Sequence, residues 1–148
     1  MNAVLCLTTL LAVICLSGAM TPEYKQKLIS SLTDCMKKHG LEKEEVVELM
    51  KTDKLPEAKE KQCIVGCFMD KMGFVKDLTL DWATFKISNP EKFDSPEGID
   101  KANQVVDICA KTVSEKEKDL CQLGVKTITC LHEQAQKVQL QLPDFSFE

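Results

Sequence analysis

Apolar residues recur every three or four positions along most of this chain, which is the pattern of amphipathic helices. The clearest example is the segment of residues 21–40. Thr21 suits a helix N-cap, Pro22 the first helical position, and Gly40 the left-handed C-cap. We therefore predict a helix there, with its apolar stripe facing inward. That stripe comprises Tyr24, Leu28, Leu32, Cys35 and Met36.

The same periodicity predicts further helices along the chain. They are expected at residues 41–51, from about 56 to 73, at 82–87 and at 96–112. A last helix is expected to end near residue 137. Ser114 and Glu117 have the spacing of a capping box, so they indicate where the last helix begins. The segment SNPEKFDSPEG, residues 88–98, is rich in turn residues and predicts a loop. The pattern as a whole predicts an all-α fold of about six short helices.

The two ends of the chain depart from this pattern. Residues 4–16 form an apolar run of thirteen, too short to span a bilayer, and small residues follow at 17–19. We predict that residues 1–19 are a secretory signal peptide. No later segment is long and apolar enough for a membrane helix, so the mature product is expected to be soluble and secreted. At the other end, residues 138–148 form an apolar tail in which Val138, Leu140 and Leu142 alternate with polar residues.

The amino-acid composition and charge exclude some classes of binding partner. The chain has 148 residues and a net charge of −4, which fits a single domain at residues 20–148. All 19 basic residues are lysine. Readers of nucleic acid and phosphate favour the bidentate guanidinium of arginine. The absence of arginine, together with the acidic balance, argues against nucleic acid and anionic membranes as partners.

Six cysteines remain after the predicted signal peptide, and an even number in a secreted chain of this size predicts three disulfides. Cys63 and Cys67 lie on one face of a predicted helix, about 6 Å apart, and can reach two different neighbours. Cys121 and Cys130 face opposite sides of the last helix and cannot reach each other. Excluding the 63–67 and 121–130 pairs leaves ten of the fifteen pairings open. The six residues are Cys35, Cys63, Cys67, Cys109, Cys121 and Cys130.

The spacing C-x27-C-x3-C-x41-C-x11-C-x8-C strongly resembles the six-cysteine form of the insect odorant-binding protein family, which includes the pheromone-binding proteins. The resemblance covers the whole mature chain. It implies the pairs Cys35–Cys67, Cys63–Cys121 and Cys109–Cys130. It also implies an internal apolar cavity walled by several helices. Motifs of secreted helical enzymes are absent, so no enzymatic activity is expected, and binding of this kind needs no cofactor. The expected function is the carriage of small apolar odorants or pheromones to a chemosensory receptor, as a monomer or weak homodimer.

Apolar residues crowd the segment 68–85, where Met and Phe would suit an adaptable pocket. We predict a ligand site that combines this segment with the later helices and the tail. Its residues are Phe68, Met72, Trp82, Phe85, Ala102, Val105, Ile128, Leu131, Leu140, Leu142 and Phe145. Tyr24 or Thr112 would supply a polar contact. Residues 140–145 would form a lid, and Asp144 and Glu148 would make its hold depend on pH.

Other interpretations of the same residues are weaker. Structural zinc sites need a second close cysteine pair, and redox sites use C-x-x-C, so neither metal binding nor redox chemistry is expected at Cys63 and Cys67. His39 and His132 lack a recognisable nucleophile, so they are expected to be solvated or capping residues, or in the case of His132 a pH-sensitive contact. A secreted helical signalling or defence protein with a filled core remains the alternative function.

Overall fold

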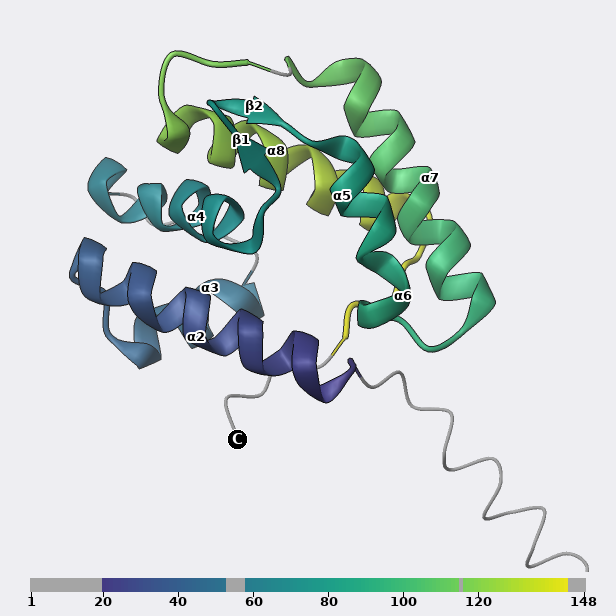
Figure 1. The fold of residues 1–148 in the computed structure, drawn as a ribbon, viewed down its shortest axis with the longest axis horizontal. Coiled ribbons are helices and arrows are strands. Elements are labelled where there is room, and N and C mark those ends of the chain that lie inside the picture. The colour runs from purple at the N-terminus through teal and green to yellow at the C-terminus, as the bar shows by residue number, and fades with distance from the viewer. Residues whose placement is uncertain (1–19, 53–57, 115, 144–148) are drawn as a thin grey trace, which may run out of the picture.

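The computed structural model describes residues 20–52, 58–114 and 116–143. This part of the chain is mainly helical, with one short β-hairpin (Figure 1). Because α5 and α6 are separated only by Ser88, the seven helical segments form the six predicted units. The elements are α2 (Pro22–His39), α3 (Lys43–Thr52), α4 (Lys59–Met72), β1 (Val75–Lys76), β2 (Thr79–Leu80), α5 (Trp82–Ile87), α6 (Asn89–Lys92), α7 (Pro96–Thr112) and α8 (Leu120–Lys137).

Helix boundaries follow the capping residues closely. The Thr21 hydroxyl accepts a hydrogen bond from the Tyr24 amide, and Gly40 adopts φ 62°, so α2 begins and ends as predicted. Ser95 caps α7 in the same way by accepting from the Gly98 amide. Helices α5 and α7 also lie where the sequence predicted them.

Two local predictions were wrong, and one further element was not predicted. Residues 89–92 form the short helix α6 rather than a loop. Residues 75–80 form an antiparallel hairpin, with Val75 opposite Leu80. The last helix begins at Leu120, because the side chain of Asp119, and not that of Ser114, caps it by accepting from the Gln122 amide. The Ser114 hydroxyl instead donates to the Lys116 carbonyl.

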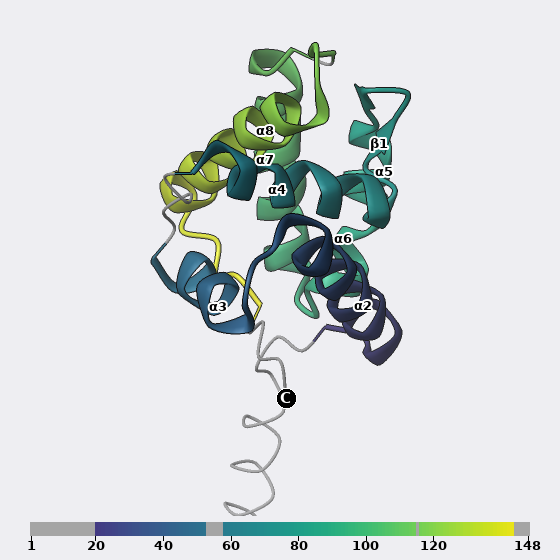
Figure 2. The ribbon, with the colours of Figure 1, turned by 90° about the vertical axis from the view of Figure 1, so that its left-hand side faces the viewer.

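Helix α4 occupies the centre of the fold. It lies between α8 on one side and α2 on the other (Figure 2) and contacts both. Helix α7 packs against α8, and α5 and α6 pack against α7. The buried side chains that meet inside this arrangement come from all the longer helices, from α5 and from the hairpin. Long helices therefore surround an interior of apolar residues on several sides.

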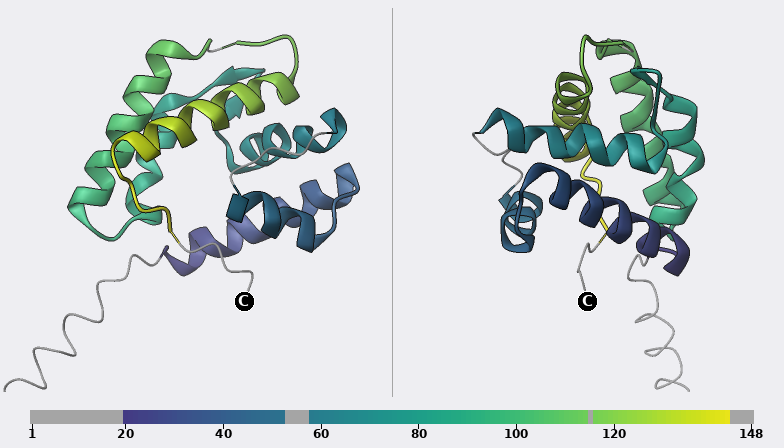
Figure 3. Two further views of the ribbon diagram at one scale, coloured as in Figure 1. Left: turned by 180° about the vertical axis from the view of Figure 1, so that it is seen from behind. Right: turned by 60° about the vertical axis from the view of Figure 1, so that its left-hand side comes forward.

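The chain after α8 turns back across the molecule. The Leu140 amide donates to the Ala135 carbonyl, and Gln139 takes φ 53°, so the helix ends in a left-handed turn. From there the segment up to residue 143 runs toward α2 (Figure 3). Leu140 is half-buried and Pro143 is buried. The predicted tail thus packs on the domain over its described part, and residues 144–148 lie outside the described residues.

Candidate ligand-binding site

Three disulfides tie the helices together, with the predicted pairing confirmed. Cys35–Cys67 joins α2 to α4, Cys63–Cys121 joins α4 to α8, and Cys109–Cys130 joins α7 to α8. Their Cα–Cα distances are 5.8, 4.3 and 5.9 Å. Cys63 and Cys67, each bonded to a cysteine of a different helix, therefore anchor the central helix to two neighbours. They are not available as metal ligands or as a redox pair.

Two glycines bring α4 and α8 into backbone contact. A Cβ added at Gly124 would lie 2.4 Å from the Gly66 nitrogen, and one at Gly66 would lie 2.1 Å from the Leu120 carbonyl oxygen. Both glycines follow the Cys63–Cys121 bridge by three residues, which is one helical turn. The bridge and the glycine contact therefore hold the same two helices at one close crossing.

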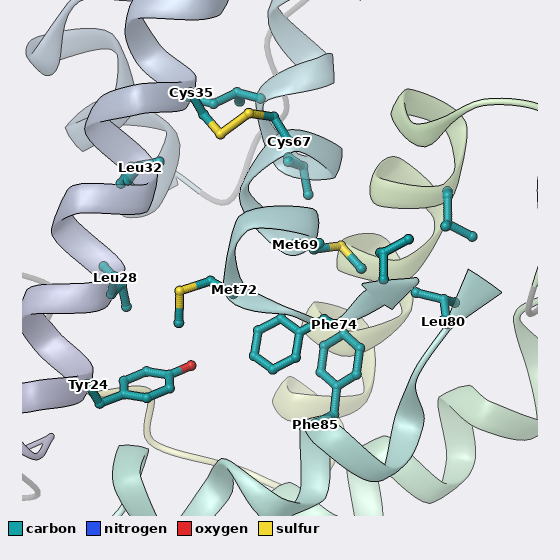
Figure 4. Close-up of a cluster of buried hydrophobic side chains, with 14 of the residues drawn as sticks. Tyr24, Leu28, Leu32, Cys35, Cys67, Met69, Met72, Phe74, Leu80 and Phe85 are labelled. Carbon is teal, nitrogen blue, oxygen red and sulfur yellow. A yellow bond between two sulfur atoms is a disulfide. The ribbon is translucent and has the colours of Figure 1, made fainter. Parts of the chain in front are cut away.

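An aromatic cluster forms the interior beside these helices. The Phe74 and Phe85 rings stack with centroids 4.2 Å apart, and the Trp82 ring lies 5.2 Å from that of Phe85. Met72 and Leu28 lie close to the rings (Figure 4). All five residues are buried members of one apolar cluster. Rings and a flexible thioether give this interior a surface that can adapt to an apolar guest.

A half-buried ammonium group lies over these rings. The Lys92 Nζ atom is 5.0 Å from the centroid of Phe74, 5.8 Å from that of Tyr24 and 5.9 Å from that of Phe85. It donates to the Asn89 Oδ1 atom at 3.2 Å. Burial lowers the pKa of Lys92 to about 8, although the nearby charge of Glu91 opposes the shift.

Asn89 holds this lysine in place. It is only 2% exposed, and its amide nitrogen donates to Asn103 Oδ1 at 2.9 Å. That bond orients the Asn89 oxygen toward Lys92 and connects α6 to α7. A polar group buried to this extent needs such partners to avoid the cost of desolvation.

Tyr24 brings a hydroxyl group to the same region. Its side chain is buried, and its hydroxyl points toward Phe74 and Phe85 (Figure 4). Burial raises the pKa of Tyr24, the charge of Glu91 adds to the rise, and the Ser88 hydroxyl acts against it. The phenol, which is neutral at physiological pH even without this shift, is therefore still harder to ionise. A polar contact between Tyr24 and a ligand stays a prediction.

Trp82 offers a second buried donor. Within the described part of the chain, its Nε1 hydrogen has no acceptor. A buried donor without a partner costs about 1–3 kcal/mol, and a bound oxygen atom could recover this. The aromatic cluster thus carries polar groups of three kinds: the Tyr24 hydroxyl, the Trp82 N–H and the Lys92 ammonium.

The predicted site residues are distributed unevenly. Met72, Trp82 and Phe85 are buried together, and Phe68 and Leu131 are half-buried against the same cluster. Ala102 and Val105 are buried on α7, outside that cluster. Ile128 is 37% exposed and Leu142 is 53% exposed, and Leu140 is half-buried. Phe145 lies outside the described residues. As a common lining of one internal cavity, the set stays a prediction.

Thr112 does not fit its predicted role. It is exposed, and its hydroxyl donates to the Ile108 carbonyl at 3.1 Å, one turn earlier in the same helix. That bond is typical of a helical threonine and leaves the side chain at the surface. Of the two polar contacts considered, only Tyr24 reaches the aromatic interior.

The histidines lie at helix ends or surfaces. His132 is half-buried, and its Nε2 atom is 2.8 Å from the Gln136 amide nitrogen. Partial burial lowers the pKa of His39, with the Lys38 charge adding to the effect. Among the described residues, no group of three His, Cys, Asp or Glu side chains could hold a metal ion.

Two open hollows mark the surface of the described chain. One of about 500 Å³ lies beside the hairpin and Trp82, and one of about 370 Å³ lies along α2 near Ile29. Both open broadly to solvent, and neither includes Lys92, Phe74 or Phe85. Over the described residues, every helix is too short or too polar to cross a membrane.

Sequence reasoning missed Lys92 and Asn89 because the segment NPEK was interpreted as loop. Pro90, early in a run that follows Ser88, is a helix-start signal that could have indicated α6. The contacts of the Lys92 ammonium depend on how α6 packs against α2 and α5, which no local pattern encodes.

Comparison with known proteins agrees with this architecture. The model of the PBP/GOBP family matches residues 17–134. No curated protein sequence matches the chain significantly. Three solved structures share its fold. The odorant-binding protein dmelOBP28a of Drosophila melanogaster is 23% identical with a TM-score of 0.64, over 80% of this chain and 98% of its own.

The other two structures match this chain with similar identity and TM-score. The fatty acid binding protein OBP56a from the oral disk of the blowfly Phormia regina is 24% identical with a TM-score of 0.59, over 80% of this chain and 97% of its own. Odorant binding protein 5 of Apis mellifera is 20% identical with a TM-score of 0.63, over 84% of this chain and 99% of its own. With the family match over most of its length and six cysteines paired as expected, this chain belongs to the PBP/GOBP family of insect odorant-binding proteins, which are non-enzymatic binding proteins.

Proposed function

We propose that this protein carries small apolar molecules, odorants or pheromones among them, through an extracellular fluid. The observation that carries the proposal is the buried cluster of Met72, Phe74, Trp82 and Phe85 inside a frame of helices held by three disulfides. A frame fixed by covalent bridges depends less on a densely filled core, and so tolerates an internal site. Burying about 300 Å² of ligand surface would contribute about 7 kcal/mol before association costs.

Several further features support this proposal without extending it to one ligand. Family membership favours an apolar cargo, and the blowfly relative is named for fatty acid binding. Residues 1–19 as a signal peptide, together with the disulfides, favour secretion. Delivery to a chemosensory receptor, as a monomer or weak dimer, belongs to the same proposal.

A fluorescent apolar probe tests the function. We expect N-phenylnaphthylamine to bind saturably, with a micromolar dissociation constant, and to be displaced by dodecanol in competition. The expectation follows from transfer of apolar surface out of water into an adaptable interior. A filled helical bundle of the signalling or defence type would show neither saturation nor displacement, and that result would refute carriage.

The tail is proposed as a lid over this site. Its described part runs from α8 toward α2 with Pro143 buried, and residues 140–145 are apolar enough to close a pocket mouth. Deleting residues 138–148 is expected to raise the ligand release rate at least threefold in stopped-flow measurements at pH 7. In the full chain, release is expected to quicken from pH 7 toward pH 5, because acid weakens any hold of the tail that depends on the Asp144 and Glu148 charges. The same release rates with and without the tail, from pH 7 to pH 5, would remove the lid from the proposal.

A further inference from the structure

We propose that Lys92 binds the carboxylate of a long-chain acid, which makes carboxylate ligands the preferred cargo of this protein. The inference rests on the proposed function, because it assigns a ligand class to the same interior. It is carried by the position of Lys92 among aromatic rings and by the contacts that its ammonium makes and lacks.

Lys92 has no anionic partner in the described part of the chain, although it lies among aromatic rings, whereas five other lysines do have one. Lys61, Lys71, Lys86, Lys101 and Lys126 each form an ion pair with an aspartate or glutamate. Within the described part of the chain, no carboxylate oxygen lies within 4 Å of the Lys92 Nζ atom. The exposed surface pairs contribute little to stability. A cation withdrawn from water gains much more from an anion, because the interaction is less screened there.

The ammonium group retains donors for a ligand. It has three N–H groups, of which one donates to Asn89. The rings of Tyr24, Phe74 and Phe85 attract its charge but are poor acceptors beside an oxygen atom. Asn89 is itself held by Asn103, so the lysine is anchored on one side. A carboxylate would complete its coordination with charge-assisted hydrogen bonds.

The location also fits a headgroup site. The Lys92 Nζ atom lies 5.0 and 5.9 Å from the centroids of Phe74 and Phe85, whose rings belong to the same buried cluster as Met72 and Trp82. An alkyl chain packed along that cluster would therefore bring its terminal group within reach of the ammonium. An acid bound in this way would bury its chain and neutralise a charge in one step.

The other titratable groups of the region do not replace a ligand anion. Tyr24 on α2 is neutral at pH 7, as tyrosine ordinarily is, and burial raises its pKa further. Glu91 on α6 is exposed, and its charge raises the pKa of Lys92 without reaching ion-pair distance. A cation that loses water without gaining an anion favours the neutral amine, which agrees with the pKa of about 8. A bound carboxylate would reverse that preference.

Competition with N-phenylnaphthylamine at pH 7 tests the assignment. The competitors are dodecanoate, its methyl ester and dodecanol, which share one chain and differ in headgroup. We expect Lys92→Met to weaken dodecanoate binding about tenfold, and to leave the ester and the alcohol within twofold. The exposed Lys111 gives the matched control, since Lys111→Met makes the same change of net charge away from the site. The control should bind all three ligands like the original chain.

Proton uptake gives a second readout that a structural role would not produce. With the pKa of Lys92 at about 8, half of the amine is uncharged at pH 8. Dodecanoate should therefore draw up to about half a proton per molecule, measured by calorimetry in two buffers of different ionisation enthalpy. The ester should draw none, and Lys92→Met should abolish the uptake.

The outcomes separate this inference from the proposed function. If dodecanoate binds Lys92→Met as tightly as the original chain, or if all three ligands weaken together, carboxylate recognition by Lys92 is wrong while carriage stands. If none of the three displaces the probe from the original chain, the proposed function itself fails.

Discussion

Removing the Cys63–Cys121 bridge by the double substitution Cys63→Ala, Cys121→Ala is expected to lower the free energy of unfolding by about 4 kcal/mol. The bridge spans 58 residues, and closing a loop of that length removes much of the freedom of the unfolded chain. For a domain of this size that loss is a large share of the total stability. Denaturation with guanidinium chloride, followed by circular dichroism without reductant, measures the change.

The Cys109–Cys130 bridge provides the comparison. It spans only 21 residues, so Cys109→Ala, Cys130→Ala is expected to cost about 3 kcal/mol through the same effect. Alanine is used in both pairs because Cys109 is completely buried and serine would bury a hydroxyl there. An unfolding free energy unchanged by loss of the longer bridge would show that the disulfides do not hold the frame.

Substitution Gly124→Ala is expected to destabilise the protein by about 3 kcal/mol. On helix propensity alone, the change would stabilise α8 by about 1 kcal/mol. The added Cβ would however lie 2.4 Å from the nitrogen and 2.7 Å from the Cα atom of Gly66. Backbone atoms cannot rotate away as a side chain can, so α4 and α8 would have to separate. The prediction therefore has the opposite sign from that of an ordinary exposed helix.

Urea denaturation of Gly124→Ala beside Thr129→Ala tests this packing. Thr129 is exposed on the same helix, and its replacement is expected to change the free energy of unfolding by less than about 0.5 kcal/mol. Because the glycine contact lies one turn from the Cys63–Cys121 bridge, Gly124→Ala should also weaken probe binding. Equal or higher stability of Gly124→Ala would contradict the close helix crossing.

Local signals made much of the fold predictable. Thr21, Pro22 and Gly40 define α2, and Ser95 defines α7, because a cap satisfies backbone groups that the helix itself leaves open. The start of α8 was mispredicted because a plausible capping box competed with tertiary contacts. Lys116 pairs with Thr79 of β2, which keeps the segment before Asp119 extended. Asp119 then becomes the first residue able to cap the helix.

The hairpin was not predicted from the sequence, because its turn lacks the usual residues. Tight two-residue turns usually carry Asn-Gly or Asp-Gly, because both central residues need positive φ. Here Asp77 and Leu78 adopt φ 52° and 59°. Leucine pays a steric cost in this conformation that the packing of Phe74, Val75 and Leu80 into the core offsets. Only the folded context reveals such a turn.

Disulfide pairing and the ligand site show the limits of residue-level reasoning. Helix geometry alone left ten pairings open, and only the family resemblance of the cysteine spacing selected one. For the site, apolar core residues and pocket residues look alike in sequence, so Met72 and Ile128 were predicted together although one is buried and the other exposed. The charged member, Lys92, depends on three rings from separate segments meeting at one point.

The central claim is that a guest occupies the apolar interior between these helices. A crystal structure of the protein with bound dodecanoate tests it most directly. Electron density is expected for one alkyl chain inside the fold, against Met72 and Phe85, with its carboxylate at Lys92. An interior filled by side chains, with dodecanoate found only on the outer surface, would contradict it.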